Sequence, residues 1–440
     1  RAMARKQSLL FLLVQGLLVA GVLLVPAPAG AQQFPSNDDL TVMLRYLVED
    51  GEAPAIVLGI LESDGSTRVV SYGNGGAGTR QLGPRSLFEI GSVTKTFTGV
   101  LLAEMVAKKE VALADPLSKY LPAGVKAPSR DGVEITLLDL ATHFSGLPRL
   151  PDNQGTEDPA DPYAAYTVEK LYAFLSSHQL RRVPGAQYEY SNLGVGLLGH
   201  LLARAAGRTY LDLMRERILG PLGMTMTGGA VGGDAAAWMV NGHTATGDRV
   251  PLWTFTEAIQ GAGALRSNAE DMLKYLKANV GAPQTDLQRA MRVAHEARRP
   301  FGDQSVGLAW TTVKFQGRTL VRHSGSTAGF SSLIAFDPDG RAGFVMLTNA
   351  GDFGDDIGED FLRRGLPFAM PVVAVGRSTL ERYVGTYEIA PGRNAVVRLE
   401  RDGTLTFQAP GNVRFQMYAE SPTAFYMKRA PSRVSFPTNT

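Results

Sequence analysis

The sequence predicts an α+β protein in which one antiparallel sheet is flanked by helices. Short apolar and alternating runs, typical of strands, lie near both ends of residues 36–350, whereas helical patterns fill the stretch between them. Strands at both ends of a unit favour a single sheet assembled from distant parts of the chain. Further alternating segments at 379–440 predict a small, separate β-rich domain.

Composition and charge exclude several classes of protein. The 440 residues are 44% hydrophobic and 20% charged, which indicates a globular chain of two or three domains. Lys and Arg number 44 against 42 Asp and Glu, and no long basic run is present, so charge alone draws no nucleic acid. The absence of cysteine excludes disulfides, thiolate catalysis, Cys-ligated zinc and iron–sulfur clusters.

The N-terminal segment has the layout of a secretory signal peptide. Basic residues precede the apolar run 9–25, and the small residues Ala29 and Ala31 close it. The alternative is a retained membrane anchor, because the run is near the lower length limit of a spanning helix. We expect residues 1–31 to be cleaved, which leaves a periplasmic or secreted protein without a stable membrane span.

The elements follow in order along the chain. A helix at 38–49 precedes two strands, at 55–61 and up to Tyr72, and a helix at 92–108 comes next. The predominantly helical subdomain, about 110–300, carries helical patterns at 135–142, 167–178, 194–206, 210–219 and 269–280. Strand patterns follow at 306–313, 320–323, 330–336 and 343–348.

The predicted catalytic domain spans 32–364, and residues 365–378 form a linker. The linker begins with a charge-free stretch that contains two prolines. The β-rich domain at 379–440 ends directly after a strand-like run, so our expectation includes a truncated domain.

Ser92 and Lys95 form the first candidate catalytic pair. They begin an apolar helix three residues apart, on the same face about one turn from each other. A serine hydroxyl becomes a nucleophile when a neighbouring base takes its proton, and a desolvated lysine can be that base. The alternative is that Ser92 is only a helix N-cap and Lys95 a solvated residue of the first turn.

Two further motifs add the groups that such a pair requires. Tyr190-Ser191-Asn192 precedes a helix, and its phenol can act as a base where cations favour the phenolate. His323-Ser324-Gly325-Ser326 ends a strand, where a backbone N–H next to the nucleophile can form an oxyanion hole.

Other motifs give weaker evidence of function. The glycine pattern at 73–78 fits a dinucleotide-binding motif but lacks a helix after it, so we expect a loop. The six histidines form no ligand pattern, and we expect neither metal nor cofactor. Glycines at 261 and 263 predict a close approach of the backbone to a neighbouring element.

The order Ser-x-x-Lys, Tyr-x-Asn and His-Ser-Gly resembles that of the serine β-lactamase and penicillin-binding protein superfamily. Tyr-x-Asn is similar to the class C β-lactamase branch, and 114–122, 135–148 and 221–224 resemble its periplasmic DD-carboxypeptidase/endopeptidase relatives. The resemblance covers about residues 40–350 and implies the β-lactamase/transpeptidase-like fold. The segment 380–387 resembles the lipocalin-like domain appended to many such hydrolases.

The resemblance implies a role for each matching residue. Ser92 is the acylated nucleophile, Lys95 shares its proton, and Tyr190 is the general base. Asn192 binds the acyl-side amide of the substrate and helps to hold Lys95. The amides of Ser92 and Ser326 form the oxyanion hole, with Ser324 and Gly325 completing the substrate-binding strand. His143 lies in a structural loop of the pattern and is expected to pack rather than to catalyse.

His323 departs from the family, where lysine is usual. Lysine is a permanent cation that anchors a substrate carboxylate, whereas histidine titrates near pH 6.5. We therefore expect weaker selection for anionic substrates, and a rate that depends on pH near the titration of His323.

Three functions stay open at this point. The first is an exported serine hydrolase that forms an acyl-enzyme with β-lactams or D-Ala-type peptidoglycan peptides. The second is a carboxylesterase of the β-lactamase-like type that cleaves short acyl esters, which His323 favours. The third is a β-lactam-binding module with little turnover. The partner is then a small molecule or peptide, and the oligomeric state is not predicted.

Overall fold

The computed structural model describes residues 34–436, except 50, 52, 156, 157, 159, 231, 245, 316, 317, 340, 352–372, 401, 402, 411–413, 420, 428 and 429. These residues fall into two compact units, one within Gly30–Pro367 and one within Phe368–Thr440. The expected signal peptide at 1–31, and residues 365–372 of the expected linker, lie outside the described residues. The two units are considered separately below.

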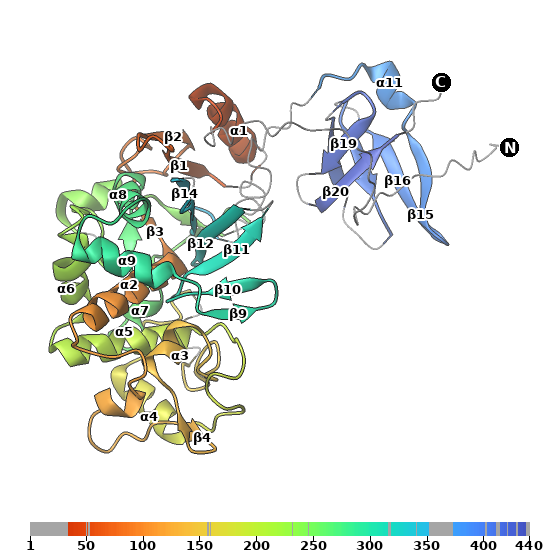
Figure 1. Ribbon diagram of the computed structural model, residues 1–440. Coiled ribbons are helices and arrows are strands. Elements are labelled where there is room, and N and C mark those ends of the chain that lie inside the picture. Colours follow the sequence, from red (N-terminus) through yellow and green to blue (C-terminus); the bar gives the residue numbers. More distant parts are fainter. Residues whose placement is uncertain are drawn as a thin grey trace, which may run out of the picture. The chain divides into compact units, whose positions relative to one another are not determined.

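An eight-stranded sheet forms the frame of the larger unit (Figure 1). Its strands are β1 (Ala55–Leu61), β2 (Thr67–Gly73), β9 (Arg299–Phe301), β10 (Gln304–Val306), β11 (Thr311–Phe315), β12 (Arg318–Ser326), β13 (Ser331–Asp337) and β14 (Ala342–Thr348). The order is β2-β1-β14-β13-β12-β11-β10-β9, and all neighbours are antiparallel. The prediction of one antiparallel sheet built from both ends of the unit is confirmed.

Helices cover this sheet and form the rest of the unit. They are α1 (Asn37–Glu49), α2 (Thr94–Ala107), α3 (Leu137–Ala141), α4 (Val168–Ser177), α5 (Asn192–Ala206), α6 (Tyr210–Met214), α7 (Gln260–Gly263), α8 (Ala269–Asn279) and α9 (Asp286–His295). In Figure 1, α3 and α4 lie at the end of the unit remote from β1 and β2. Strands β1, β13 and β14 are buried along their whole length, which explains why apolar residues predominate in them without alternation.

Shorter elements connect these parts. Two-residue strands pair as β3 (Phe88–Glu89) with β8 (Arg266–Ser267), β4 (Ser129–Arg130) with β5 (Val133–Glu134), and β6 (Gly242–His243) with β7 (Arg249–Val250). Single helical turns lie at Gly91–Val93, Leu117–Tyr120, Arg215–Leu219 and Gly233–Trp238. No helix of the described residues is long and apolar enough to cross a membrane.

Two details differ from the sequence prediction. The expected strand 306–313 is split, because residues 307–310 leave the sheet and hydrogen-bond to helical regions: Leu308 N donates to Ala294 O and Ala309 N to Ala141 O. A Cβ at Gly307 would lie 2.7 Å from Ala294 O, so this approach requires glycine. The unpredicted helix α9 begins with a capping box between Thr285 and Gln288, which was the signal available in the sequence.

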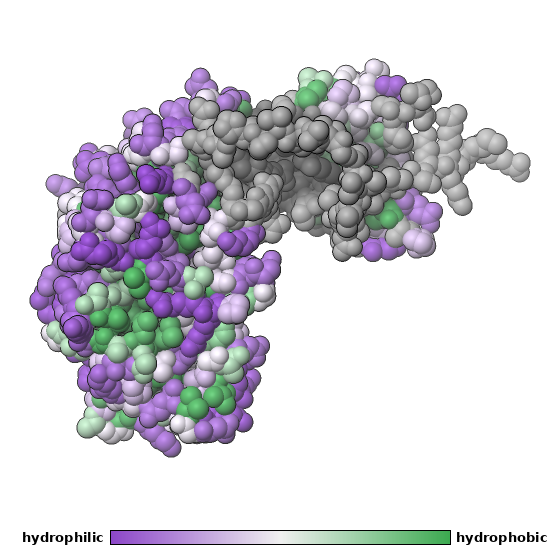
Figure 2. All heavy atoms as spheres, in the orientation of Figure 1, coloured by the Kyte–Doolittle hydropathy of each residue, from purple (hydrophilic) through white to green (hydrophobic). Residues whose placement is uncertain are grey.

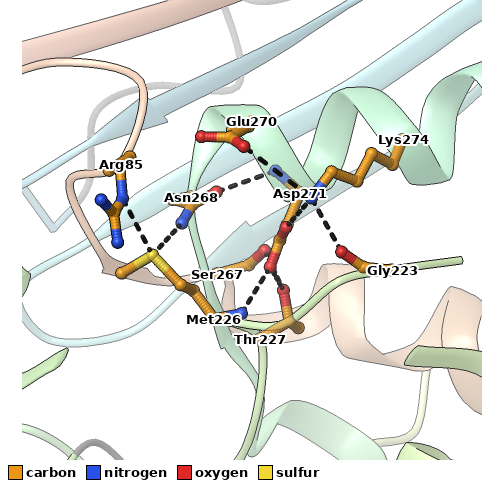
Figure 3. A network of polar contacts seen from close by, with 9 residues as sticks. All are labelled: Arg85, Gly223, Met226, Thr227, Ser267, Asn268, Glu270, Asp271 and Lys274. Carbon is orange, nitrogen blue, oxygen red and sulfur yellow. Dashed lines mark hydrogen bonds and ion pairs between the residues drawn. The ribbon is translucent and has the colours of Figure 1, made fainter. Parts of the chain in front are cut away.

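A polar network fixes α8, the helix that packs on β1 and β14 (Figure 3). Asn268 caps its first turn, and the buried carboxylate of Asp271 accepts hydrogen bonds from Met226 N, Thr227 Oγ1 and Lys274 Nζ. Thr227 Oγ1 also hydrogen-bonds with Ser267 Oγ of β8, the strand that pairs with β3. Since β3 leads directly to the turn that carries Ser92, the network is connected to this turn through β8 and β3.

The smaller unit is a six-stranded antiparallel meander, which confirms the predicted β-rich domain. Helix α11 (Arg377–Glu381) precedes strands β15 (Gly385–Ala390), β16 (Arg393–Leu399), β17 (Leu405–Gln408), β18 (Phe415–Ala419), β19 (Ala424–Met427) and β20 (Ala430–Ser435). Its own core includes Val397, Phe407 and Phe425.

On the face of the larger unit shown in Figure 2, hydrophilic residues predominate and apolar ones gather over its helices.

Candidate active site

Ser92 lies in a tight turn pressed against β12. The turn Gly91–Val93 precedes α2, and Gly91 has φ +46°, a backbone conformation that favours glycine. A Cβ on Gly91 would lie 2.8 Å from Ser326 N, and one on Gly325 would lie 2.1 Å from Ile90 O. These two glycines therefore allow the nucleophile turn to contact the third motif directly.

Lys95 contacts Ser92 from the buried side. Its Nζ lies 2.8 Å from Ser92 Oγ and donates to the carbonyl oxygen of Ala262 at 2.7 Å. The side chain is 0% exposed, and burial, followed by the charge of Arg149, lowers the pKa of Lys95 well below its usual value. The neutral amine is thus favoured, and its lone pair can take a proton from the hydroxyl.

The alternative reading of this motif is wrong. The N-cap of α2 is Val93, with no side-chain cap, so the Ser92 hydroxyl does not serve the helix end. Lys95 is completely buried instead of solvated.

The carbonyl that holds Lys95 comes from the glycine run at 261–263. A Cβ on Gly261 would lie 2.8 Å from Val195 O, so α7 packs directly on α5, as the sequence predicted. The role of Ala262 O was not predicted, and Asn192 was expected to help to hold Lys95. That assignment is corrected: Asn192 Nδ2 donates to the Tyr163 hydroxyl at 3.2 Å instead. The glycine run was the available signal.

Tyr190 lies over both members of the pair. Lys95 Nζ is 5.1 Å from the centroid of its ring, and the Ser92 hydroxyl is close enough to the phenol to act on its pKa. Burial raises the pKa of Tyr190 well above its usual value, although Ser92 and Arg149 act in the opposite direction. The protonated phenol is therefore the form that this environment favours.

His143 supports Tyr190 from the side. The two rings stack with centroids 4.5 Å apart, and His143 Nδ1 accepts a hydrogen bond from Ser191 N at 3.1 Å. Burial lowers the pKa of His143 well below its usual value, so the ring is neutral. It packs on the second motif, as the sequence analysis expected.

His323 is also neutral. It is 7% exposed, its Nδ1 lies 2.6 Å from the carbonyl oxygen of Ser324, and burial lowers the pKa of His323 to about 3. The expected titration of His323 near pH 6.5 is therefore wrong. Burial of this strand removes water from the imidazole ring, and the sequence does not show how complete that burial is.

One cavity of about 660 Å³ brings the predicted residues together. Lys95 lies behind Ser92 and does not line the cavity. The other predicted site residues all line it: Ser92, Tyr190, Asn192, His323, Ser324, Gly325 and Ser326. The walls are aromatic, since Tyr188 stacks on Phe301 and Tyr163 meets Trp253 edge-on. Among the described residues, no cluster of three or more His, Asp or Glu side chains is suited to a metal ion.

The chain is similar to known proteins over most of its length. The family model described as Beta-lactamase matches residues 43–366. The D-alanyl-D-alanine-carboxypeptidase/endopeptidase AmpH of Escherichia coli K12 is 31% identical over 65% of this chain and 78% of its own length. A beta-lactamase of Lysobacter lactamgenus is 26% identical over 74% of this chain and 89% of its own.

Solved structures share the fold. The D-alanine carboxypeptidase AmpC of Burkholderia cenocepacia has a TM-score of 0.60 and 29% identity, covering 71% of this chain and 93% of that one. A mutant class C beta-lactamase has a TM-score of 0.64 at 23% identity over 71% of this chain and 92% of its own, a likeness of fold alone. With the family model matching most of its length, the chain belongs to the beta-lactamase family.

Proposed function

We propose that this serine hydrolase opens β-lactams or cleaves D-Ala-type peptides through an acyl-enzyme at Ser92. The observation that carries the proposal is the 2.8 Å contact between Ser92 Oγ and a completely buried Lys95, beside Tyr190. The relatives named as beta-lactamases and D-alanyl-D-alanine carboxypeptidases support the same substrate classes.

The pKa directions assign the proton transfers. Lys95, as the neutral amine, takes the Ser92 proton while Oγ forms its bond to the substrate carbonyl carbon. The amides of Ser92 and Ser326 stabilise the developing oxyanion. Tyr190 donates its phenolic proton to the leaving nitrogen as the C–N bond breaks, and protonated Lys95 restores it through a water molecule. Water then attacks the ester carbonyl carbon and gives a proton to Lys95, and Ser92 leaves with a proton from Tyr190. Lys95 finally returns a proton to Tyr190, so that all three groups regain their starting forms.

This scheme changes one expectation drawn from the sequence. There, Tyr190 was the general base; here the phenol begins protonated, because burial raises its pKa, and Lys95 is the first base. Asn192 stays the proposed ligand of the acyl-side amide, since its Oδ1 is buried with no hydrogen-bond partner in the described residues.

Intact-mass spectrometry with penicillin, together with turnover of a chromogenic cephalosporin and a D-Ala-D-Ala peptide, tests the proposal. We expect a transient mass increase with product release, and a loss of at least about 10³-fold in Ser92→Ala. Tyr190→Phe should lose about 10²- to 10⁴-fold, because the leaving group then lacks its proton donor. Near-full activity of Ser92→Ala would overturn the assignment.

A carboxylesterase is the second candidate, because neutral His323 places no cation on β12 at the position where the family usually has lysine. Hydrolysis of a p-nitrophenyl ester without any acylation by penicillin identifies it. Persistent acylation without product identifies a binding module.

We also propose that the protein is exported after cleavage following Ala31. The basic, apolar and small-residue order at 1–31 supports this. N-terminal sequencing of the protein recovered from the periplasm should begin at Gln32, and an intact N-terminus there would contradict it.

A further inference from the structure

The cavity keeps a positive charge although His323 supplies none. The described residues of its lining include two arginines, Arg149 and Arg322, and no aspartate or glutamate. A cavity with cations and no acid attracts an anionic group, so the loss of lysine at position 323 does not make the site neutral.

Arg149 is held at the mouth of this cavity by its backbone. Its carbonyl oxygen accepts hydrogen bonds from Asn192 N at 3.0 Å and Leu193 N at 3.2 Å, which ties it to the first turn of α5. The residue itself is exposed, and no acidic side chain of the described chain forms an ion pair with it. The guanidinium is thus positioned by the second motif while its hydrogen-bonding edges remain available.

The charge of Arg149 acts at the reaction centre. Its guanidinium carbon lies 5.0 Å from the centroid of the Tyr190 ring. Burial raises the pKa of Tyr190, Tyr163 and Tyr188, and the charge of Arg149 opposes this rise. For Lys95 and His143, the same charge adds to the lowering of the pKa by burial. Arg322, in contrast, precedes His323 on β12 and lowers only the pKa of that residue among the shifted groups.

We propose that Arg149 determines the specificity of this site by binding a carboxylate on the leaving-group side of the substrate. A guanidinium presents paired N–H donors that match the two oxygens of a carboxylate. The cation that binds the substrate carboxylate is therefore supplied by the loop before α5 and not by β12. This inference rests on the proposed function, and it names anionic substrates as the preferred class, contrary to the sequence expectation of weak selection.

A matched pair of esters tests the inference. The phenylacetyl ester of 3-hydroxybenzoic acid carries a leaving-group carboxylate, and that of methyl 3-hydroxybenzoate differs only in lacking the charge. We expect kcat/KM to favour the acid, and Arg149→Gln to reduce this preference about ten- to a hundredfold, the range of a hydrogen bond to a charged group. Because the preference is the ratio of the two kcat/KM values, any loss of activity that is common to both esters cancels.

Further variants separate the outcomes. Arg149→Lys should keep part of the preference, and Arg377→Gln, the same charge change in the smaller unit, should leave it unaltered. An unchanged ratio in Arg149→Gln, or a larger change in Arg322→Gln, would overturn the role of Arg149. Hydrolysis that persists in Ser92→Ala would instead refute the proposed function, and absence of all hydrolysis in the unmodified protein would refute both.

Discussion

Lys95 Nζ and the guanidinium carbon of Arg149 lie 5.1 Å and 5.0 Å from the centroid of the same ring, that of Tyr190. Lys95 is completely buried at the base of the cavity, whereas Arg149 is exposed at its mouth. Burial lowers the pKa of Lys95, so this residue becomes a proton acceptor. Arg149 stays charged because a guanidinium does not lose its proton in proteins.

The comparison shows how one site separates two functions of a positive residue. A base must be able to lose its charge, which requires desolvation, and a carboxylate anchor must keep it, which requires water or an anion nearby. The third motif fits neither function, because His323 is buried and its pKa is about 3. A permanent charge at position 95 and a change of the charged group at position 149 should therefore impair the site in different ways.

The largest effect is expected from Lys95→Arg. The variant places a permanent cation at this position and cannot accept the Ser92 proton at neutral pH, so acylation should fall about 10²- to 10⁴-fold. The rate of acylation by a β-lactam or an activated ester, measured by stopped flow, checks this. Arg149→Lys is the matched control, and we expect it to remain within about tenfold of the unmodified protein. Equal losses in the two variants would refute the division of roles.

A smaller effect is expected in the pH dependence. The reaction needs neutral Lys95, so activity falls as the pH drops through the pKa of Lys95 and the amine gains a proton. Arg149→Gln removes a positive charge that, after burial, lowers this pKa, so the pKa rises and the acid limb moves to higher pH. Profiles of kcat/KM for the neutral ester measure the shift.

His323→Gln is the control variant in the measurement of the pH profile. Since the pKa of His323 is about 3, the variant should not move the limb between pH 5.5 and 7.5. A limb in this range that disappears in His323→Gln would restore the expectation drawn from the sequence. A shift to lower pH in Arg149→Gln would show that Arg149 does not repel the proton on Lys95.

The sequence predicts the fold and the motif residues because both depend on local patterns. Alternating and apolar runs placed the strands of the sheet, and the spacing of Ser92 and Lys95 placed them on one helical turn. What it could not give depends on contacts between distant segments. The carbonyl of Ala262 reaches Lys95 across 167 positions, and the burial of His323 follows from the packing of β12 on the nucleophile turn. Arg149 gave no signal, since an exposed arginine is ordinary in a sequence.

The smallest expected effect concerns the support of Lys95 by α7. Gly261→Ala places a Cβ 2.8 Å from Val195 O and 3.0 Å from Gly199 Cα, both backbone atoms of α5, so α7 must shift. Such overpacking costs about 1–3 kcal/mol of stability. The shift also moves Ala262 O away from Lys95 Nζ, and loss of that hydrogen bond should lower acylation about three- to tenfold.

Thermal unfolding and acylation rates, measured well below the melting temperature, separate these two consequences. Gly228→Ala is the control, because nothing lies within 4 Å of its added Cβ, and it should change neither quantity. If Gly261→Ala is less stable but acylates at the normal rate, the carbonyl of Ala262 does not position the amine. Burial alone would then be sufficient to make Lys95 the base, and the contrast with Arg149 would rest on exposure to water only.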